Sequence, residues 1–125
     1  MTPKVLVIED EPSIHDLLEI YLEKKGCQVF WTELGQEGVA LAKSEKPNVI
    51  LIDVHLPDMD GMQALCLIRE FDKEAKLFLF SGLYDEAQEA KAISCGGSGF
   101  IDKALGVDAV LEAVLKALSE LKLIS

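Results

Sequence analysis

The feature that most constrains the fold is the run Asn-Val-Ile-Leu-Ile-Asp at residues 48–53, an apolar segment that ends on the carboxylate of Asp53. Pro47 precedes it, and Pro, Asp and Gly residues follow at positions 57–61, so turns bound the run on both sides. A short run that is apolar on both faces is typical of a central strand in a parallel sheet covered by helices. In such sheets, ligands bind beyond the carboxyl ends of the strands. Taken alone, Asp53 is explained by the preference of Asp for strand ends and turns.

Strand-like and helix-like segments alternate along the whole chain. Short apolar runs predict further strands at residues 4–8, 28–32, 76–80 and 100–101. Helical spacing of apolar residues predicts helices at about 35–44, 62–71, 85–95 and 107–121, and one from Pro12 to a C-cap at Gly26. Five β-then-α units imply right-handed crossovers and a parallel sheet with helices on both faces. No linker or repeat divides the chain, so a single domain over residues 1–125 is expected.

Charge and composition exclude several classes of function. The 125 residues carry 12 Lys plus Arg against 22 Asp plus Glu, a net charge of −10, which argues against binding to nucleic acids or to anionic membranes. No apolar run is long enough to span a bilayer, and the first residues do not form a signal peptide, so a cytoplasmic protein is expected. The three cysteines, Cys27, Cys66 and Cys95, match no zinc or redox spacing and are interpreted as structural thiols.

Chemically capable side chains stand at the predicted strand ends. Glu9 and Asp10 end the first strand, Asp53 the third, Ser81 the fourth and Lys103 the fifth. Clustered carboxylates repel one another, and Mg²⁺, which prefers oxygen ligands, removes that repulsion. One oxygen of Asp53 would then be free to attack phosphorus, while Lys103 and Ser81 supply a charge and a hydroxyl to the phosphoryl group. The pattern predicts a Mg²⁺-dependent phosphoryl-transfer site.

Five stretches, in this order, resemble the receiver domains of two-component response regulators, the CheY-like family. They are Val-Ile-Glu-Asp-Glu (7–11), Leu-Ile-Asp (51–53), Leu-Pro-Asp-Met-Asp-Gly (56–61), Phe-Ser-Gly (80–82) and Gly-Phe-Ile-Asp-Lys (99–103). The resemblance covers essentially the whole chain. It implies a doubly wound α/β fold with five parallel strands in the order 2-1-3-4-5 and five helices.

The resemblance also implies a role for each site residue. Asp53 is the expected phosphoacceptor, Asp10 a direct Mg²⁺ ligand, Glu9 a ligand through water, and the His55 carbonyl a backbone ligand. The remaining roles fall on Ser81 as the switch hydroxyl, Phe100 as the switch aromatic and Lys103 as the conserved lysine of the family.

The partners implied by the resemblance are other signalling proteins. The expected phosphoryl donor is a sensor histidine kinase or a histidine phosphotransfer protein. Phosphorylation is expected to switch the surface formed by the fourth helix, fifth strand and fifth helix. An output partner that the sequence does not identify, or a second copy of the chain in a phosphorylation-dependent homodimer, would bind there.

Four positions depart from the commonest pattern of the family. Ser81 replaces Thr, Gly82 replaces Ala, Phe100 replaces Tyr, and Ala104 replaces the Pro that usually follows the lysine. A cis bond costs about 3 kcal/mol before a residue other than proline, which puts the family's cis geometry at residues 103–104 in question.

The path of a water molecule that attacks phosphorus opposite Asp53 is expected to pass two further side chains. By the same resemblance these are His55 and Leu83. We expect the bulk of Leu83 to exclude the water, and this effect to outweigh any help from His55 as a base.

Two other classes of function use related features. An aspartyl-nucleophile phosphohydrolase places a second Asp two residues after the nucleophile, where this chain has His55. A flavin-binding module needs a hydroxyl- and Gly-rich loop after the first strand, where this chain has Glu-Asp-Glu (9–11). We therefore expect a protein that catalyses only its own phosphorylation and dephosphorylation, and no enzyme acting on a separate substrate.

Overall fold

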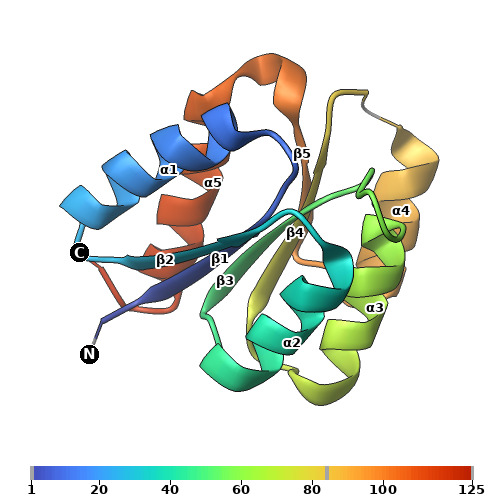
Figure 1. Cartoon of the computed structure of the whole chain (residues 1–125), viewed down its shortest axis with the longest axis horizontal. Coiled ribbons are helices and arrows are strands. Elements are labelled where there is room, and N and C mark those ends of the chain that lie inside the picture. Colours follow the sequence, from blue (N-terminus) through green and yellow to red (C-terminus); the bar gives the residue numbers. More distant parts are fainter. Residues whose placement is uncertain (1, 84, 125) are drawn as a thin grey trace.

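The computed structural model describes residues 2–83 and 85–124 and contains one five-stranded sheet in the order β2-β1-β3-β4-β5 (Figure 1). All neighbouring strands pair in parallel. The strands are β1 (Lys4–Ile8), β2 (Gln28–Thr32), β3 (Val49–Asp53), β4 (Lys76–Ser81) and β5 (Gly99–Asp102). The predicted strand order is thereby confirmed, with β3 in the centre of the sheet.

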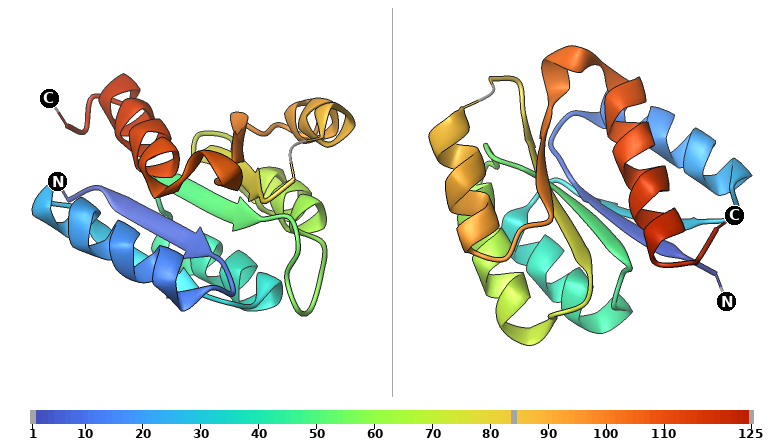
Figure 2. Two further views of the ribbon diagram at one scale, coloured as in Figure 1. Left: turned by 90° about the horizontal axis from the view of Figure 1, so that it is seen from above. Right: turned by 180° about the vertical axis from the view of Figure 1, so that it is seen from behind.

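Helices cover both faces of the sheet. Helices α1 (Pro12–Lys24) and α5 (Val107–Glu120) lie on one face, and α2 (Gly35–Glu45), α3 (Gly61–Phe71) and α4 (Glu86–Ser94) lie on the other. Two further views in Figure 2 show these layers from above and from behind. The termini lie together on the side of the molecule opposite the carboxyl ends of the strands, as Figure 1 shows.

The core consists of two clusters, one on each face of the sheet. In β1, Leu6 and Ile8 belong to the cluster beneath α2 and α3, while Val5 and Val7 belong to the cluster beneath α1 and α5. All five residues of β3 are buried, as its continuous apolar run predicted. Burial on both faces fixes the position of this strand, and therefore the place where Asp53 leaves the sheet.

The region after β4 differs most from the prediction. Strand β5 extends from Gly99 to Asp102, longer than expected, and a short 3₁₀ helix follows it at Lys103–Leu105. The Asp102 side chain caps this helix by accepting a hydrogen bond of 2.9 Å from the Ala104 amide. The Lys103–Ala104 bond is trans, and no cis peptide bond occurs among the residues described. Position 104 lacks the family's proline, which would lower the free-energy cost of a cis bond, so the trans form is favoured there.

The remaining boundaries lie close to the predicted ones. Helix α1 ends at Lys24 with Lys25 as its C-cap, and Gly26, the predicted cap, is the next residue, with a positive φ of 85°. Helix α3 begins one residue earlier than expected, at Gly61, and α2 ends one residue later, at Glu45. Asp85 caps α4 from outside, with its side chain accepting from Ala87 N, so the helix itself spans Glu86–Ser94. Within the described part of the chain, no helix combines the length and apolarity needed to cross a membrane.

Candidate functional site

The carboxyl ends of β1 and β3 bring three carboxylates together. The two strands are neighbours with Ile8 opposite Ile52, so the residues that follow them meet at one edge of the sheet. Glu9, Asp10 and Asp53 each offer an oxygen, and these oxygens lie within 4.8 Å of one another. The structure thus gathers the three acidic residues that the sequence predicted to form one site.

Gly61 allows the chain to fold back closely against the end of β3. A Cβ atom at this position would collide with the backbone carbonyl oxygen of Asp53. The Gly61 amide donates to the Val54 carbonyl (2.8 Å), and the Asp60 side chain caps α3 by accepting from Met62 N (2.8 Å). Without a side chain at residue 61, the loop and the start of α3 can lie directly over the strand that carries Asp53.

The Lys103 ammonium contacts both buried carboxylates of the site. Its Nζ lies 2.8 Å from Glu9 Oε2 and 3.0 Å from Asp53 Oδ2. Burial acts to lower the pKa of Lys103, but its contacts with the two carboxylates outweigh burial, so the pKa is raised and the ammonium charge is favoured. The ammonium also lies 4.8 Å from the centre of the Phe80 ring, a cation–π contact that the sequence did not predict.

Glu9 is the most deeply buried acidic group of the site. Burial raises the pKa of the Glu9 carboxyl, the charge of Asp53 adds to this, and Lys103 only partly offsets it, which leaves the pKa at about 7. Its Oε2 atom forms an ion pair with the Lys103 ammonium at 2.8 Å and has no further hydrogen-bond donor among the residues described. A buried, incompletely satisfied carboxylate beside two others provides hard oxygen donors of the kind that Mg²⁺ prefers.

His55 and Leu83 lie at the exposed rim of this site. The backbone amide of His55 donates to Asp53 Oδ1 (3.1 Å), which fixes the carboxylate from the loop side. Leu83 is 81% exposed, and its amide donates to the Ser81 hydroxyl oxygen (3.2 Å). The ligand role of the His55 carbonyl and the effect of either side chain on water remain predictions.

Ser81 and Phe100 occupy the neighbouring strands β4 and β5. Ser81 is almost fully buried at the end of β4, next to Asp102 of β5 in the register. Phe100 is partly buried, and it packs against the core cluster beneath α2 and α3. The two predicted switch residues therefore lie on adjacent strands, and Ser81 directly follows Phe80, the residue that pairs with Asp53 of β3.

Two further residues support the site without belonging to its acidic cluster. Asp58, in the loop after β3, accepts hydrogen bonds from Gly35 N (2.7 Å) and Gln36 N (3.0 Å) at the start of α2. Trp31 of β2 donates from Nε1 to the Glu9 carbonyl (2.8 Å). Both contacts join segments more than 20 residues apart, so no local sequence signal could have revealed them.

His15 packs within the fold, on α1. Its ring stacks on Trp31, with 4.6 Å between the ring centres, and it lies 3.0 Å from Glu19 Oε2 one turn further along α1. This packing explains His15 without a metal ion.

Comparison with known proteins places these features in one family. The model of the family described as the response regulator receiver domain matches residues 5–115. The chain is 30% identical to the chemotaxis protein CheY of Bacillus subtilis over 120 residues, covering 95% of this chain and all of the relative. It is 28% identical to the cell cycle response regulator CtrA of Brucella ovis, covering 89% of this chain but only 48% of that relative, about half its length.

Solved structures agree with the sequence comparison. The CheY chain in the CheX–CheY–BeF₃–Mg²⁺ complex of Borrelia burgdorferi superposes with a TM-score of 0.81 and 28% identity, covering 93% of this chain and 89% of that one. The two chains therefore share this fold.

Proposed function

The chain belongs to the family of response regulator receiver domains of two-component systems, and on this basis we propose that it accepts a phosphoryl group on Asp53. The observation that carries the proposal is the buried Asp53 carboxylate, which lies with Glu9 and Asp10 around one point and contacts a buried ammonium. A sensor histidine kinase or a histidine phosphotransfer protein would be the donor. In the transfer, an Asp53 oxygen bonds to phosphorus as the bond from phosphorus to the donor histidine breaks.

Glu9, Asp10, Asp53 and the His55 carbonyl are the groups that would hold Mg²⁺. When bound, the ion supplies positive charge that lowers the repulsion among the carboxylates and between Asp53 and the incoming phosphoryl oxygens. The three carboxylate oxygens lie within 4.8 Å of one another, and Asp10 is exposed, so solvent reaches the cluster. Mg²⁺ retains several waters when it binds proteins, which suits a site open on one side.

Lys103 has a separate role in this proposal. Its ammonium already contacts Asp53 Oδ2 at 3.0 Å, so it is placed to contact a phosphoryl oxygen attached to that carboxylate. The Phe80 ring beneath it and the Glu9 carboxylate beside it keep the side chain at the site. A fixed positive charge at this position favours the extra negative charge of the phosphorylated state.

The output is proposed to arise from Ser81 and Phe100. The Ser81 hydroxyl would move from its contact with the Leu83 amide toward the phosphoryl oxygens. That movement would open space for the Phe100 ring on the adjacent strand, and so change the surface formed by α4, β5 and α5. An output partner, or a second copy of the chain, would recognise the changed surface. The Borrelia relative, which was solved with CheX, BeF₃ and Mg²⁺, shows that a receiver of this fold binds another protein in that complex.

In this proposal the chain catalyses only its own phosphorylation and dephosphorylation. It is therefore not an enzyme for a separate substrate. The test is the mass of the intact protein after incubation with acetyl phosphate, with Mg²⁺ or with a chelator. We expect the mass to increase by at most one phosphoryl group per chain, and only when Mg²⁺ is present. We expect no such increase for Asp53→Asn. Repeated turnover of a phosphate ester, or equal labelling in the presence of the chelator, would overturn the proposal.

A further inference from the structure

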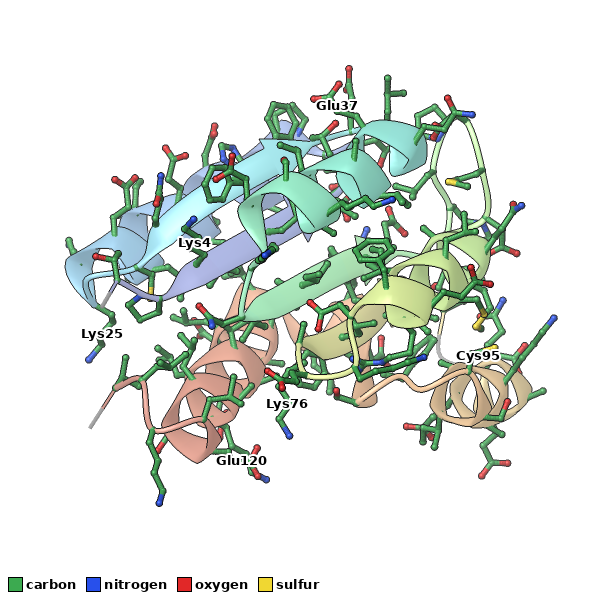
Figure 3. All side chains as sticks on the ribbon, turned by 90° about the horizontal axis from the view of Figure 1, so that it is seen from below. Lys4, Lys25, Glu37, Lys76, Cys95 and Glu120 are labelled. Atoms are coloured by element: carbon green, nitrogen blue, oxygen red, sulfur yellow. The ribbon has the colours of Figure 1, made fainter. Side chains whose placement is uncertain are left out.

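Cys66 and Cys95 are 29 positions apart in the sequence, but the fold brings them together between α3 and α4. Arg69, one turn after Cys66 on α3, donates from Nε to the Gly96 carbonyl (2.8 Å), directly after Cys95. Leu65, which precedes Cys66, packs against the turn that follows Cys95. A Cβ atom added to Gly97 of this turn would lie 3.2 Å from Leu65 Cδ1. Cys95 itself packs against the core cluster that contains Leu65, and Figure 3 shows it between the two helices.

The two thiols act on each other directly. Burial raises the pKa of the Cys66 thiol, and the adjacent Cys95 thiol raises it further, to about 11. Both cysteines are free and partly exposed, so small reagents can reach them. Cys27, in contrast, is buried in the cluster on the opposite face of the sheet and cannot join the pair.

We propose that Cys66 and Cys95 form an oxidisable pair that closes to an intramolecular disulfide when a hydroperoxide reaches the surface between α3 and α4. In the proposed sequence Cys95 reacts with the peroxide and Cys66 resolves the product. The Cys95 sulfur attacks the peroxide, an S–O bond forms, the O–O bond breaks and water leaves after protonation. The Cys66 sulfur then attacks the Cys95 sulfenic acid, the S–O bond breaks, and the Cys66 proton leaves with the hydroxyl as water. Overall, two thiols and one hydrogen peroxide give one disulfide and two waters.

The position of the pair gives the disulfide a structural consequence. Helix α4 contributes only Ala92 as a buried residue within the described chain, so few core contacts hold the helix. Cys95 is the C-cap of α4 and precedes the turn at Gly96, which leads into β5. A covalent link to Cys66 would fasten this end of α4 to α3. The chemistry itself requires neither Asp53 nor a metal ion.

The experiment treats the dilute, full chain with hydrogen peroxide, blocks the remaining thiols and digests the protein with trypsin. Trypsin cleaves after Arg69 and Lys91, so the two cysteines appear on separate peptides unless a disulfide joins them. We expect a linked peptide containing Cys66 and Cys95, loss of two of the three free thiols, and full reversal by dithiothreitol. The oxidised protein should remain monomeric on a non-reducing gel.

Matched variants separate this pair from general oxidation. Cys27→Ala should lose two thiols as the wild type does, whereas Cys66→Ala and Cys95→Ala should give no intramolecular linked peptide. In Cys66→Ala, dimedone should trap a sulfenic acid on Cys95. Oxidation of the wild type only to sulfinic or sulfonic acids, or disulfides only between molecules, would overturn the proposal.

Discussion

Lys103 Nζ lies 3.0 Å from Asp53 Oδ2, a hydrogen-bonded ion pair between residues 50 positions apart in the sequence. The same ammonium lies 2.8 Å from Glu9 Oε2. The carboxylate proposed to accept the phosphoryl group is therefore paired with a cation before any phosphoryl group arrives. This arrangement couples the stability of the fold to the chemistry of the site.

Removal of the Lys103 charge should destabilise the metal-free protein strongly. The Lys103→Met variant keeps most of the side-chain volume but leaves Glu9 and Asp53 buried without their cation. Breaking a buried pair by removing one partner costs about 3–5 kcal/mol of unfolding free energy. Urea denaturation in the presence of a chelator measures this loss, and added Mg²⁺ should restore part of it.

Lys4→Met is the matched control for Lys103→Met. Lys4 forms a surface pair with Glu45 at 3.5 Å, with the two side chains 35% and 36% exposed. Solvent screens such a pair, so its loss should cost less than about 1 kcal/mol. Equal destabilisation by the two variants would show that the ion pairs at the site contribute no more stability than a surface ion pair.

The stability contributed by Asp58 should depend on pH in the acidic range. The Gln36 and Gly35 amides donate to the Asp58 carboxylate and hold its pKa below its ordinary value of 3.8. Because the folded state favours the charged form, this contribution is present above pH 3.8 and is lost as the pH falls through the lower, folded-state pKa. Asp58→Asn should therefore be less stable than the wild type near neutral pH, and this difference should shrink on acidification. Parallel stability curves from urea denaturation at each pH would contradict the prediction.

The ring of Phe100 should exchange between two positions before phosphorylation. A tyrosine here would have a hydroxyl that favours an outward, solvent-facing ring, whereas Phe100 has none. Relaxation-dispersion NMR detects exchange on the microsecond-to-millisecond timescale, and we expect it at Phe100 and Ser81. Phe100→Tyr should reduce the inward population and weaken the signal. A flat dispersion profile in the unphosphorylated wild type would rule out the exchange.

Loss of the phosphoryl group should be slow and should accelerate when Leu83 becomes small and polar. Leu83 is 81% exposed, so Leu83→Asn removes no core packing and isolates the effect on water. Phosphate release is measured from wild type, Leu83→Asn and His55→Ala between about pH 5.5 and 8, where histidine side chains commonly change charge. An unchanged or slower release in Leu83→Asn would refute exclusion by Leu83. A pH dependence that disappears only in His55→Ala would assign control to the histidine.

The fold was predictable because its signals are local and repeated. Each strand of the sheet is a short apolar run, and β3 is buried on both faces, as its sequence indicated. The alternation of strands and helices by itself predicts that Glu9, Asp53 and Lys103 lie at one edge of the sheet. The family resemblance supplied the strand order, which periodicity alone does not determine.

The sequence could not predict contacts that depend on tertiary packing. The Asp58 contacts with α2, the Trp31 hydrogen bond to Glu9, and the meeting of Cys66 and Cys95 all join distant segments. Cysteine spacing identifies pairs within one motif, and here one thiol lies on α3 and the other at the C-cap of α4. The short helix at Lys103–Leu105 has no apolar pattern of its own and depends on the Asp102 side chain, which accepts from the Ala104 amide, a donor that proline would lack.

The most direct test of the account locates the phosphoryl group on the chain. The protein is incubated with acetyl phosphate and Mg²⁺, the acyl phosphate is reduced with borohydride, and the peptides are sequenced by mass spectrometry. We expect homoserine at position 53, and we expect it to disappear when Mg²⁺ is chelated and in Asp53→Asn. Homoserine at another acidic residue such as Asp10 or Asp58, or undiminished phosphorylation of Asp53→Asn, would contradict it.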